Sequence, residues 1–172
     1  MTRAVLLTLA VALAPLGSAF AQTTAENSMA APAGVERSID AVYRVISGPP
    51  GKARDWDAMR AMFTPDARLY EITSKGLRGG SVEDYIRESG PSLTSSGFTE
   101  RELNRRTEIY GDLAHAWSSY EGASADGKIK VRGVNSFQLV RQPDGEWKVF
   151  SILWQPEGAE LPLPKDLEEG GR

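Results

Sequence analysis

The chain has 172 residues, a formal net charge of −3 and no cysteine. This length predicts a single domain. The mild acidity argues against nucleic acid or an anionic membrane as the main partner. Without disulfides, the core alone has to stabilise the fold, and a chain of this length can bury enough apolar surface to do so.

The first residues have the pattern of a secretory signal peptide. Arg3 gives a basic start, residues 4–14 are almost wholly apolar, and Ala19 and Ala21 form a small-x-small cleavage site. The apolar run is shorter than the roughly 20 residues that a bilayer span needs. We expect residues 1–21 to be removed, leaving a periplasmic or secreted protein without stable membrane insertion. An uncleaved anchor or a buried helix is the alternative.

A spacer and three helices are predicted in the first part of the mature chain. Residues 22–33 lack apolar periodicity, which indicates a flexible spacer. Apolar residues at helical spacing predict a helix over 35–46, and Asp55 is a plausible N-cap for a second one. A short strand is expected over 67–73 and a turn over 76–80. Ser81 then opens a third helix with a capping-box pattern, which Gly90 and Pro91 should end.

Four long strands follow the third helix. Alternating residues separated by Gly-containing turns place them at 98–110, 113–122, 128–140 and 146–155. Strands joined in this way form an antiparallel meander. The order of elements predicts an α+β domain over 34–156, with helices on one face of the sheet. Residues 157–172 carry Pro, Gly and Glu and are expected to form a flexible tail.

The last strand is apolar on both faces. In an antiparallel strand with one solvent-exposed face, polar and apolar residues should alternate more regularly. We therefore expect a homodimer through the convex face of the sheet, with Phe150, Ile152 and Trp154 in the contact. A tail that folds back over this face is the alternative.

Two strings resemble signatures of the nuclear-transport-factor-2-like (SnoaL-like) superfamily. Residues 55–67 read DWDAMRAMFTPDA, and residues 144–149 read DGEWKV. Residues 98–102, 117–121, 132–139 and 151–155 look like an uncharacterised bacterial branch of it. The resemblance covers about 35–155 and implies a cone-shaped, cystatin-like α+β roll with a pocket at its open end. The superfamily holds enzymes as well as binding proteins, so the resemblance does not imply one function.

Several residues are candidates for a site in this cone. His115, the single histidine, is a weak catalytic candidate because histidine titrates near neutral pH; a surface position is the alternative. Glu100, Glu102 and Glu108 share a strand face by period two, as a solvated charged face or as partners of Arg132. The candidates for lining the pocket are Tyr43, Trp56, Tyr120, Arg132, Asn135, Phe137, Trp147 and Ser151.

The remaining patterns leave three hypotheses for function. With one histidine and no cysteine, no metal site is expected, and no cofactor motif is present. The first hypothesis is an exported protein that binds a small apolar or aromatic ligand. The second is a cofactor-free isomerase, dehydratase or cyclase, and the third is a dimeric interaction module. A pocket that contains a titratable group with a perturbed pKa would favour the enzyme.

Overall fold

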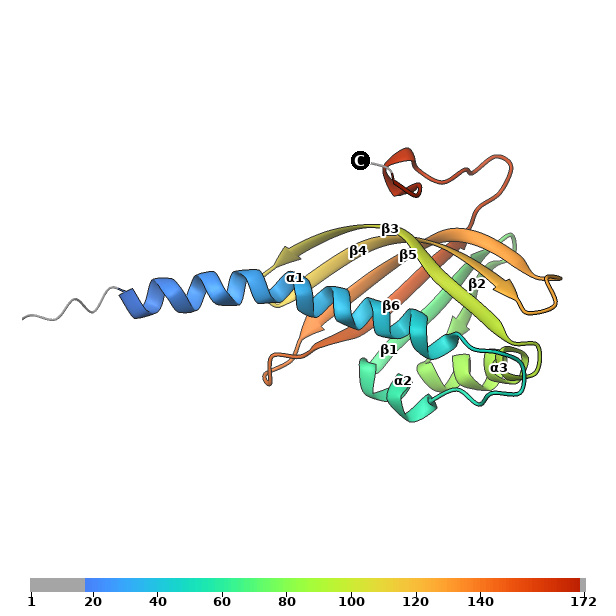
Figure 1. The fold of residues 1–172 in the computed structure, drawn as a ribbon, viewed down its shortest axis with the longest axis horizontal. Coiled ribbons are helices and arrows are strands. Elements are labelled where there is room, and N and C mark those ends of the chain that lie inside the picture. Colours follow the sequence, from blue (N-terminus) through green and yellow to red (C-terminus); the bar gives the residue numbers. More distant parts are fainter. Residues whose placement is uncertain (1–17, 171–172) are drawn as a thin grey trace, which may run out of the picture.

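Six strands form one curved mixed sheet in the computed structural model, which describes residues 18–170. In chain order the elements are α1 (Ser18–Ile46), α2 (Trp56–Met62), β1 (Phe63–Thr73), β2 (Gly76–Gly80), α3 (Val82–Ser95), β3 (Phe98–Tyr110), β4 (Leu113–Ser124), β5 (Lys130–Arg141), β6 (Trp147–Pro156) and the short 3₁₀ helix η1 (Lys165–Leu167). The strand order is β2-β1-β6-β5-β4-β3, and β1 runs parallel to β6 while the other pairs are antiparallel (Figure 1). The predicted α+β cone is confirmed.

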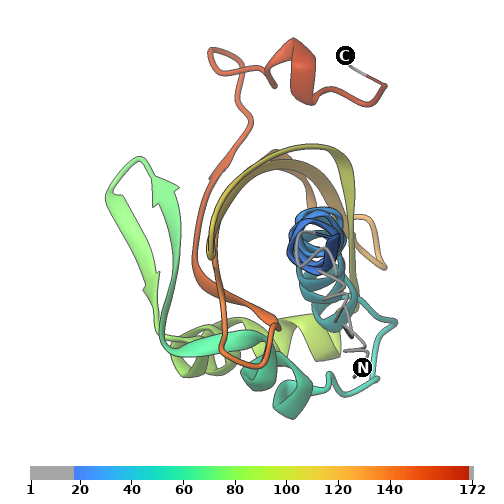
Figure 2. The same cartoon turned by 90° about the vertical axis from the view of Figure 1, so that its left-hand side faces the viewer.

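Helix α1 lies inside the curve of the sheet (Figure 2). Its apolar face buries Val35, Ile39 and Val42 against the strands, as the helical spacing of these residues predicts. The helix begins at Ser18, however, so residues 22–33 are helical instead of forming the predicted spacer. Alanine is frequent there and favours a helix. The predicted cleavage after Ala21 falls within α1, and most of the predicted signal peptide lies outside the described residues.

The hydrogen bonds at the starts of the two shorter helices are the predicted ones. Asp55 accepts a hydrogen bond from the backbone N–H of Ala58 at 2.9 Å, and Ser81 forms a complete capping box with Asp84. Helix α3 continues past Gly90 and Pro91 to Ser95 instead of ending there. Gly90 is buried beside the ring of Trp56, where a side chain would be in close contact. Residues 76–80, predicted as a turn, form β2 and pair with β1.

Arg54 connects the ends of two helices that surround the interior. Its buried guanidinium donates hydrogen bonds to four backbone carbonyls, those of Ile46, Gly48, Lys52 and Leu93, at 2.6–3.0 Å. Ile46 ends α1, and Leu93 lies in the last turn of α3. A cation at these carbonyls also complements the negative ends of both helix dipoles. The side chain therefore fixes the distance between α1 and α3.

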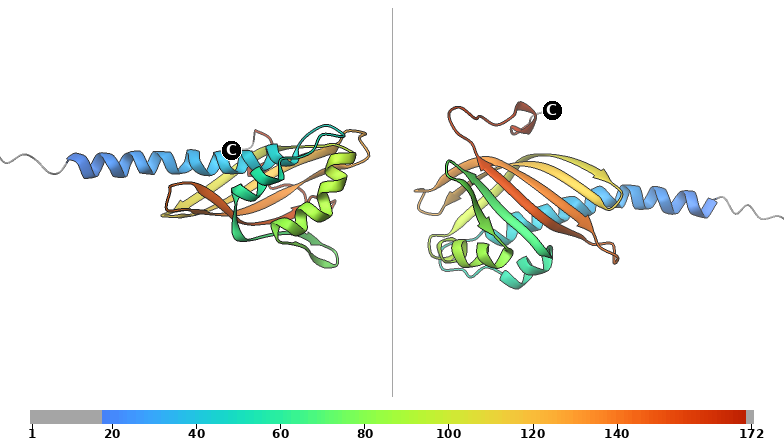
Figure 3. Two further views of the ribbon diagram at one scale, coloured as in Figure 1. Left: turned by 90° about the horizontal axis from the view of Figure 1, so that it is seen from below. Right: turned by 180° about the vertical axis from the view of Figure 1, so that it is seen from behind.

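The C-terminal residues fold back over the outer face of the sheet (Figure 3). Leu163 and Leu167 are buried there, and Ser119 of β4 donates a hydrogen bond to the backbone carbonyl of Leu167. Arg101 of β3 forms an ion pair with Glu169 at 2.8 Å. The sequence predicts a flexible tail for residues 157–172, whereas the structure buries two leucines of this segment. The alternative to the homodimer is a tail that covers the outer face of the last strand; the segment lies over β3 and β4 instead, and Phe150 of β6 stays exposed.

Candidate functional site

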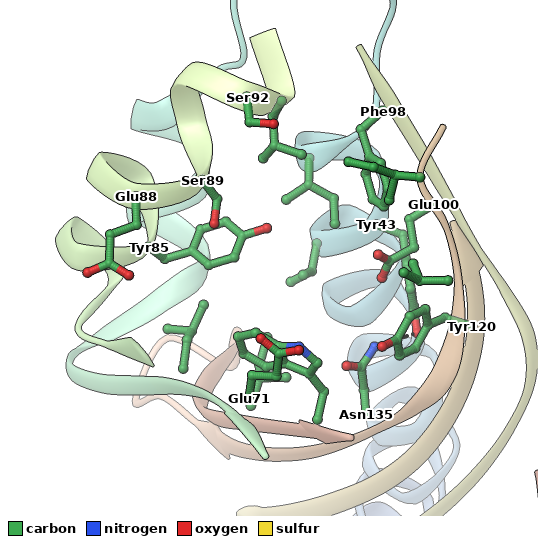
Figure 4. Close-up of a pocket in the computed structure, with 18 of the residues that line it drawn as sticks. Tyr43, Glu71, Tyr85, Glu88, Ser89, Ser92, Phe98, Glu100, Tyr120 and Asn135 are labelled. Carbon is green, nitrogen blue, oxygen red and sulfur yellow. Dashed lines mark hydrogen bonds between the residues drawn. The ribbon is translucent and has the colours of Figure 1, made fainter. Parts of the chain in front are cut away.

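A hollow of about 480 Å³ lies between the concave face of the sheet, the C-terminal part of α1, and α3 (Figure 4). Most of its wall is apolar, with Ile46, Leu69, Phe137 and Ile152 among the contributors. A few polar groups interrupt this wall. A largely apolar cavity with few polar groups is the usual form of a small-molecule site.

Three acidic residues line the hollow, Glu71, Glu88 and Glu100. Glu71 pairs with Arg78, whereas Glu100 of β3 has no such partner within residues 18–170. Figure 4 shows its carboxyl group directed into the hollow. The carboxyl group makes no hydrogen bond or ion pair with any residue in the described part of the chain, whereas the backbone N–H of Glu100 is held by Ser47 Oγ at 3.0 Å. Burial disfavours the charged form and raises the pKa of Glu100 from 4.5 to about 8. The protonated acid and the carboxylate are therefore both populated near neutral pH.

Two tyrosine hydroxyls face the same space. Tyr85 comes from α3, opposite Glu100, and Tyr120 comes from β4 beside it (Figure 4). Neither hydroxyl has a hydrogen-bond partner among residues 18–170. Burial, together with the nearby Glu100 carboxylate, raises the pKa of both tyrosines, so both stay protonated. Each can donate a hydrogen bond to an oxygen atom of a bound molecule.

Tyr43 and Asn135 form a second, paired polar group. Asn135 Nδ2 donates to Tyr43 Oη at 3.0 Å, and Tyr43 Oη lies 2.5 Å from Ser118 Oγ. Ser118 in turn donates to Glu102 Oε1. Burial raises the pKa of Tyr43, so its hydroxyl is neutral. These contacts join α1 to three strands across the floor of the hollow.

Two β-bulges decide which side chains enter the hollow. One lies between Glu102 and Asn104 in β3, and the other lies in β6 beside the Gln138–Leu139 pairing. A bulge adds one residue to a strand, so the side chains that follow it lie on the opposite face of the sheet from the one that simple alternation predicts. Simple alternation along these strands therefore fails beyond each bulge.

The sequence-predicted pocket residues divide into two groups of four. Those that line the hollow are Tyr43, Tyr120, Asn135 and Phe137. Those that lie elsewhere are Trp56, Arg132, Trp147 and Ser151.

Each of the four displaced residues has a structural contact of its own. Trp56 packs against Gly90 of α3, and Arg132 lies on the outside, 3.2 Å from Glu157. Trp147 is buried under α1 near Gly34, at the end of the sheet away from the hollow. Ser151 pairs with Gln138 just after the bulge in β6, and the bulge excludes it from the concave face.

Other predicted positions are also corrected. Ile152 and Trp154 line the hollow instead of the outer face, because the bulge precedes them, while Phe150 is exposed. His115 lies outside the hollow, where its Nε2 is 3.1 Å from Ser136 Oγ. Glu100 does not belong to a solvated face, and Glu108, beyond the bulge in β3, is exposed.

Sequence reasoning missed Glu100 and Tyr85 as site residues. Glu100 lies in a polar strand segment with Arg101 and Glu102 as neighbours, and this composition is typical of a solvent-exposed strand. For Tyr85 of α3, no local pattern showed that a hollow lay beneath the helix. The one usable signal was the apolar Phe98 two residues before Glu100, on the same strand face.

The described residues carry no sign of a metal centre. Within residues 18–170, no group of three or more His, Cys, Asp or Glu side chains could hold a metal ion. None of the helices in that range is both long enough and apolar enough to cross a membrane.

Solved structures with the same fold come from several bacteria. No protein-family model matches the sequence, and no curated protein matches it. An NTF2-like protein of unknown function from Shewanella baltica has 17% identity and a TM-score of 0.56, with 76% of this chain and 97% of that chain covered. A proposed dehydratase of the NTF2-like family from Streptomyces avermitilis has 19% identity and a TM-score of 0.57, with 73% and 95% covered.

A third structure is a protein of unknown function with a cystatin-like fold from Nostoc punctiforme. It has 12% identity and a TM-score of 0.57, with 74% of this chain and 92% of that chain covered. At these identities the likeness concerns the fold. The resemblance predicted from residues 55–67 and 144–149 is thus confirmed at that level, and the chain has the NTF2-like fold.

Proposed function

We propose that the protein binds a small, largely apolar molecule in the hollow and transfers a proton on it without a cofactor, with Glu100 as the general acid or base. The observation that carries this proposal is the unpaired carboxyl group of Glu100, directed into a cavity whose wall is mostly apolar. An acid–base catalyst works best when its pKa lies near the working pH. Burial raises the pKa of Glu100 into that range.

The two unpaired tyrosine hydroxyls support the same proposal. A proton removed from carbon next to a carbonyl group leaves negative charge on the carbonyl oxygen, and hydrogen-bond donors stabilise that charge. Tyr85 and Tyr120 present neutral O–H groups to the hollow that contains Glu100. Isomerisation and dehydration next to a carbonyl group both use such a step. The proposed dehydratase from Streptomyces avermitilis shares the fold and favours this reaction class.

Exchange of carbon-bound hydrogen in a model ketone tests the proposal. The probe is 2-tetralone, an apolar bicyclic ketone, incubated in D₂O with the protein while NMR follows deuterium entering the carbon next to the carbonyl. We expect the wild type to accelerate exchange over buffer, and Glu100→Gln to lose about 10²-fold or more of that acceleration. The matched control is Glu108→Gln, an exposed position on the same strand, which should keep the wild-type rate.

The outcomes separate catalysis from binding. If Glu100→Gln exchanges the ketone as fast as the wild type does, Glu100 is not the acid or base. If the ketone binds in the hollow but exchanges no faster than in buffer, the protein is a small-molecule-binding protein and the catalytic part of the proposal fails. When Glu100 acts as the base, the rate should rise with pH through about 8, because only the carboxylate accepts a proton.

We also propose that the protein is exported. The support is the basic start, the apolar run over residues 4–14 and the small-x-small site that ends at Ala21. Mass spectrometry of the protein from a periplasmic fraction should give a mature chain that begins at Gln22. A full-length chain recovered from the cytoplasm would contradict export.

A further inference from the structure

A line of hydrogen bonds runs from the floor of the hollow to the surface beside α1. It begins at Asn135 in β5 and passes through Tyr43 in α1 and Ser118 in β4 to Glu102 in β3. Asn135, Tyr43 and Ser118 are all buried. One end of this line is an amide that lines the cavity, so the hydrogen bonds can influence ligand binding as well as join the strands.

The far end of this line is a fixed carboxylate. Arg105 donates two hydrogen bonds to Glu102, from Nε at 2.7 Å and from Nη2 at 2.6 Å. The same guanidinium contacts Asp40 of α1 at 2.6 Å. An ionised carboxylate only accepts hydrogen bonds. Glu102 therefore sets the direction of every bond that leads away from it.

That direction determines how Asn135 is oriented. Ser118 has to donate its proton to Glu102, so its lone pair accepts the proton of the Tyr43 hydroxyl. The Tyr43 oxygen then accepts from Nδ2 of Asn135, and the Oδ1 atom of the amide is left without a partner among residues 18–170. The close-up shows the amide of Asn135 at the wall of the hollow (Figure 4). The Oδ1 atom of Asn135 is thus an acceptor of fixed orientation in the hollow, because the amide cannot turn to present its N–H groups instead.

We propose that Asn135 is a specificity-determining residue, held by Glu102 through Ser118 and Tyr43, whose Oδ1 accepts a hydrogen bond from a hydroxyl or N–H group of the bound molecule. The inference rests on the proposed function, since it names the class of molecule that the hollow takes. That class is a small, largely apolar compound that carries a hydrogen-bond donor. A site built to bond a donor group discriminates against the analogue that lacks it, because a buried acceptor is then left unpaired.

A pair of matched probes tests this selectivity. Calorimetry would measure the Kd of 2-naphthol, which has a donor hydroxyl, and of 2-methoxynaphthalene, which has the same ring system without the donor. We expect the wild type to bind 2-naphthol about tenfold more tightly. Ser118→Ala removes the acceptor of the Tyr43 proton, so Tyr43 can donate to Oδ1 and reverse the amide, and the preference should vanish or invert. Asn135→Leu should also lose the preference.

The control is Ser136→Ala, a serine one residue from Asn135 that contacts His115 instead of the network. It should keep the wild-type preference. Equal binding of the two probes by the wild type would overturn the inference while leaving the hollow as a binding site. A tenfold preference that survives in Ser118→Ala would overturn the role of the hydrogen-bond line.

If neither probe binds, that result counts against the proposed function itself. A measurement without ligand then tests the orientation of Asn135 separately. NMR of the Asn135 side chain should show one amide proton protected from exchange with water in the wild type. This protection should be lost in Ser118→Ala and kept in Ser136→Ala. If the two amide protons of the wild type exchange equally fast, or if Ser118→Ala leaves them unchanged, Glu102 does not set the orientation of Asn135.

Discussion

Replacing Glu100 by Gln should change how the stability of the protein depends on pH. The substitution keeps the shape of the side chain and removes its titration. In the unfolded chain the carboxyl group ionises near its ordinary pKa of 4.5, whereas in the folded protein burial raises the pKa to about 8. Between these values the unfolded chain has released a proton that the folded protein still holds. The wild type therefore loses stability as pH rises from 4.5 to 8, and the loss levels off above 8.

The magnitude follows from the size of the pKa change. One pKa unit corresponds to about 1.4 kcal/mol, so a rise from 4.5 to about 8 sets a ceiling of about 5 kcal/mol. The carboxyl group faces an open hollow that admits water, and this hydration lowers the cost of its charge. We expect Glu100→Gln to gain about 2–3 kcal/mol of unfolding free energy relative to the wild type between about pH 5 and about pH 8.5.

Urea unfolding of both proteins across this pH range measures the effect. The quantity to follow is the difference between their unfolding free energies at each pH, because other titrating groups cancel in it. Glu108→Gln, at the exposed position on the same strand, should show a flat difference. A flat difference for Glu100→Gln, or one in which the wild type gains stability at high pH, would refute a buried carboxyl group at Glu100.

Other substitutions test the packing around the hollow. Arg54→Met leaves four carbonyls without their donor and should lower the urea unfolding free energy by about 3 kcal/mol or more. A loss under about 1 kcal/mol would contradict a role for Arg54 in joining α1 to α3. Thr64→Val removes a buried hydroxyl that has no partner among the described residues, and the same assay should show a gain of about 1 kcal/mol. Leu167→Ala should cost about 2–3 kcal/mol if the C-terminal segment covers the sheet in solution, whereas the exposed Leu161→Ala should cost almost nothing. For the predicted homodimer, Phe150→Glu should produce a monomer in light scattering, and an unchanged assembly would exclude this part of β6 from the contact.

The sequence alone determined most of the elements and their order, apart from β2 and the first part of α1. Apolar residues at helical spacing located the inner part of α1, capping residues located the starts of α2 and α3, and Gly-containing turns located the four-stranded meander. These signals are local, since each depends on residues within one or two turns or one hairpin. Tyr120, Asn135 and Phe137 could be named as pocket residues because no bulge interrupts the pairing of β4 with β5. Tyr43 could be named because it lies on the apolar face of α1.

Only the tertiary structure decided which groups carry the chemistry. The bulges in β3 and β6 shift the alternation by one residue, and no local pattern marks them, so Trp154 turned inward and Ser151 outward. Glu100 has the sequence surroundings of a surface acid, but in the folded chain it lines a hollow between the sheet, α1 and α3 that shields most of it from water. A pKa depends on everything within reach of the charge, and for Glu100 those neighbours are far away in the sequence and close only in the folded chain.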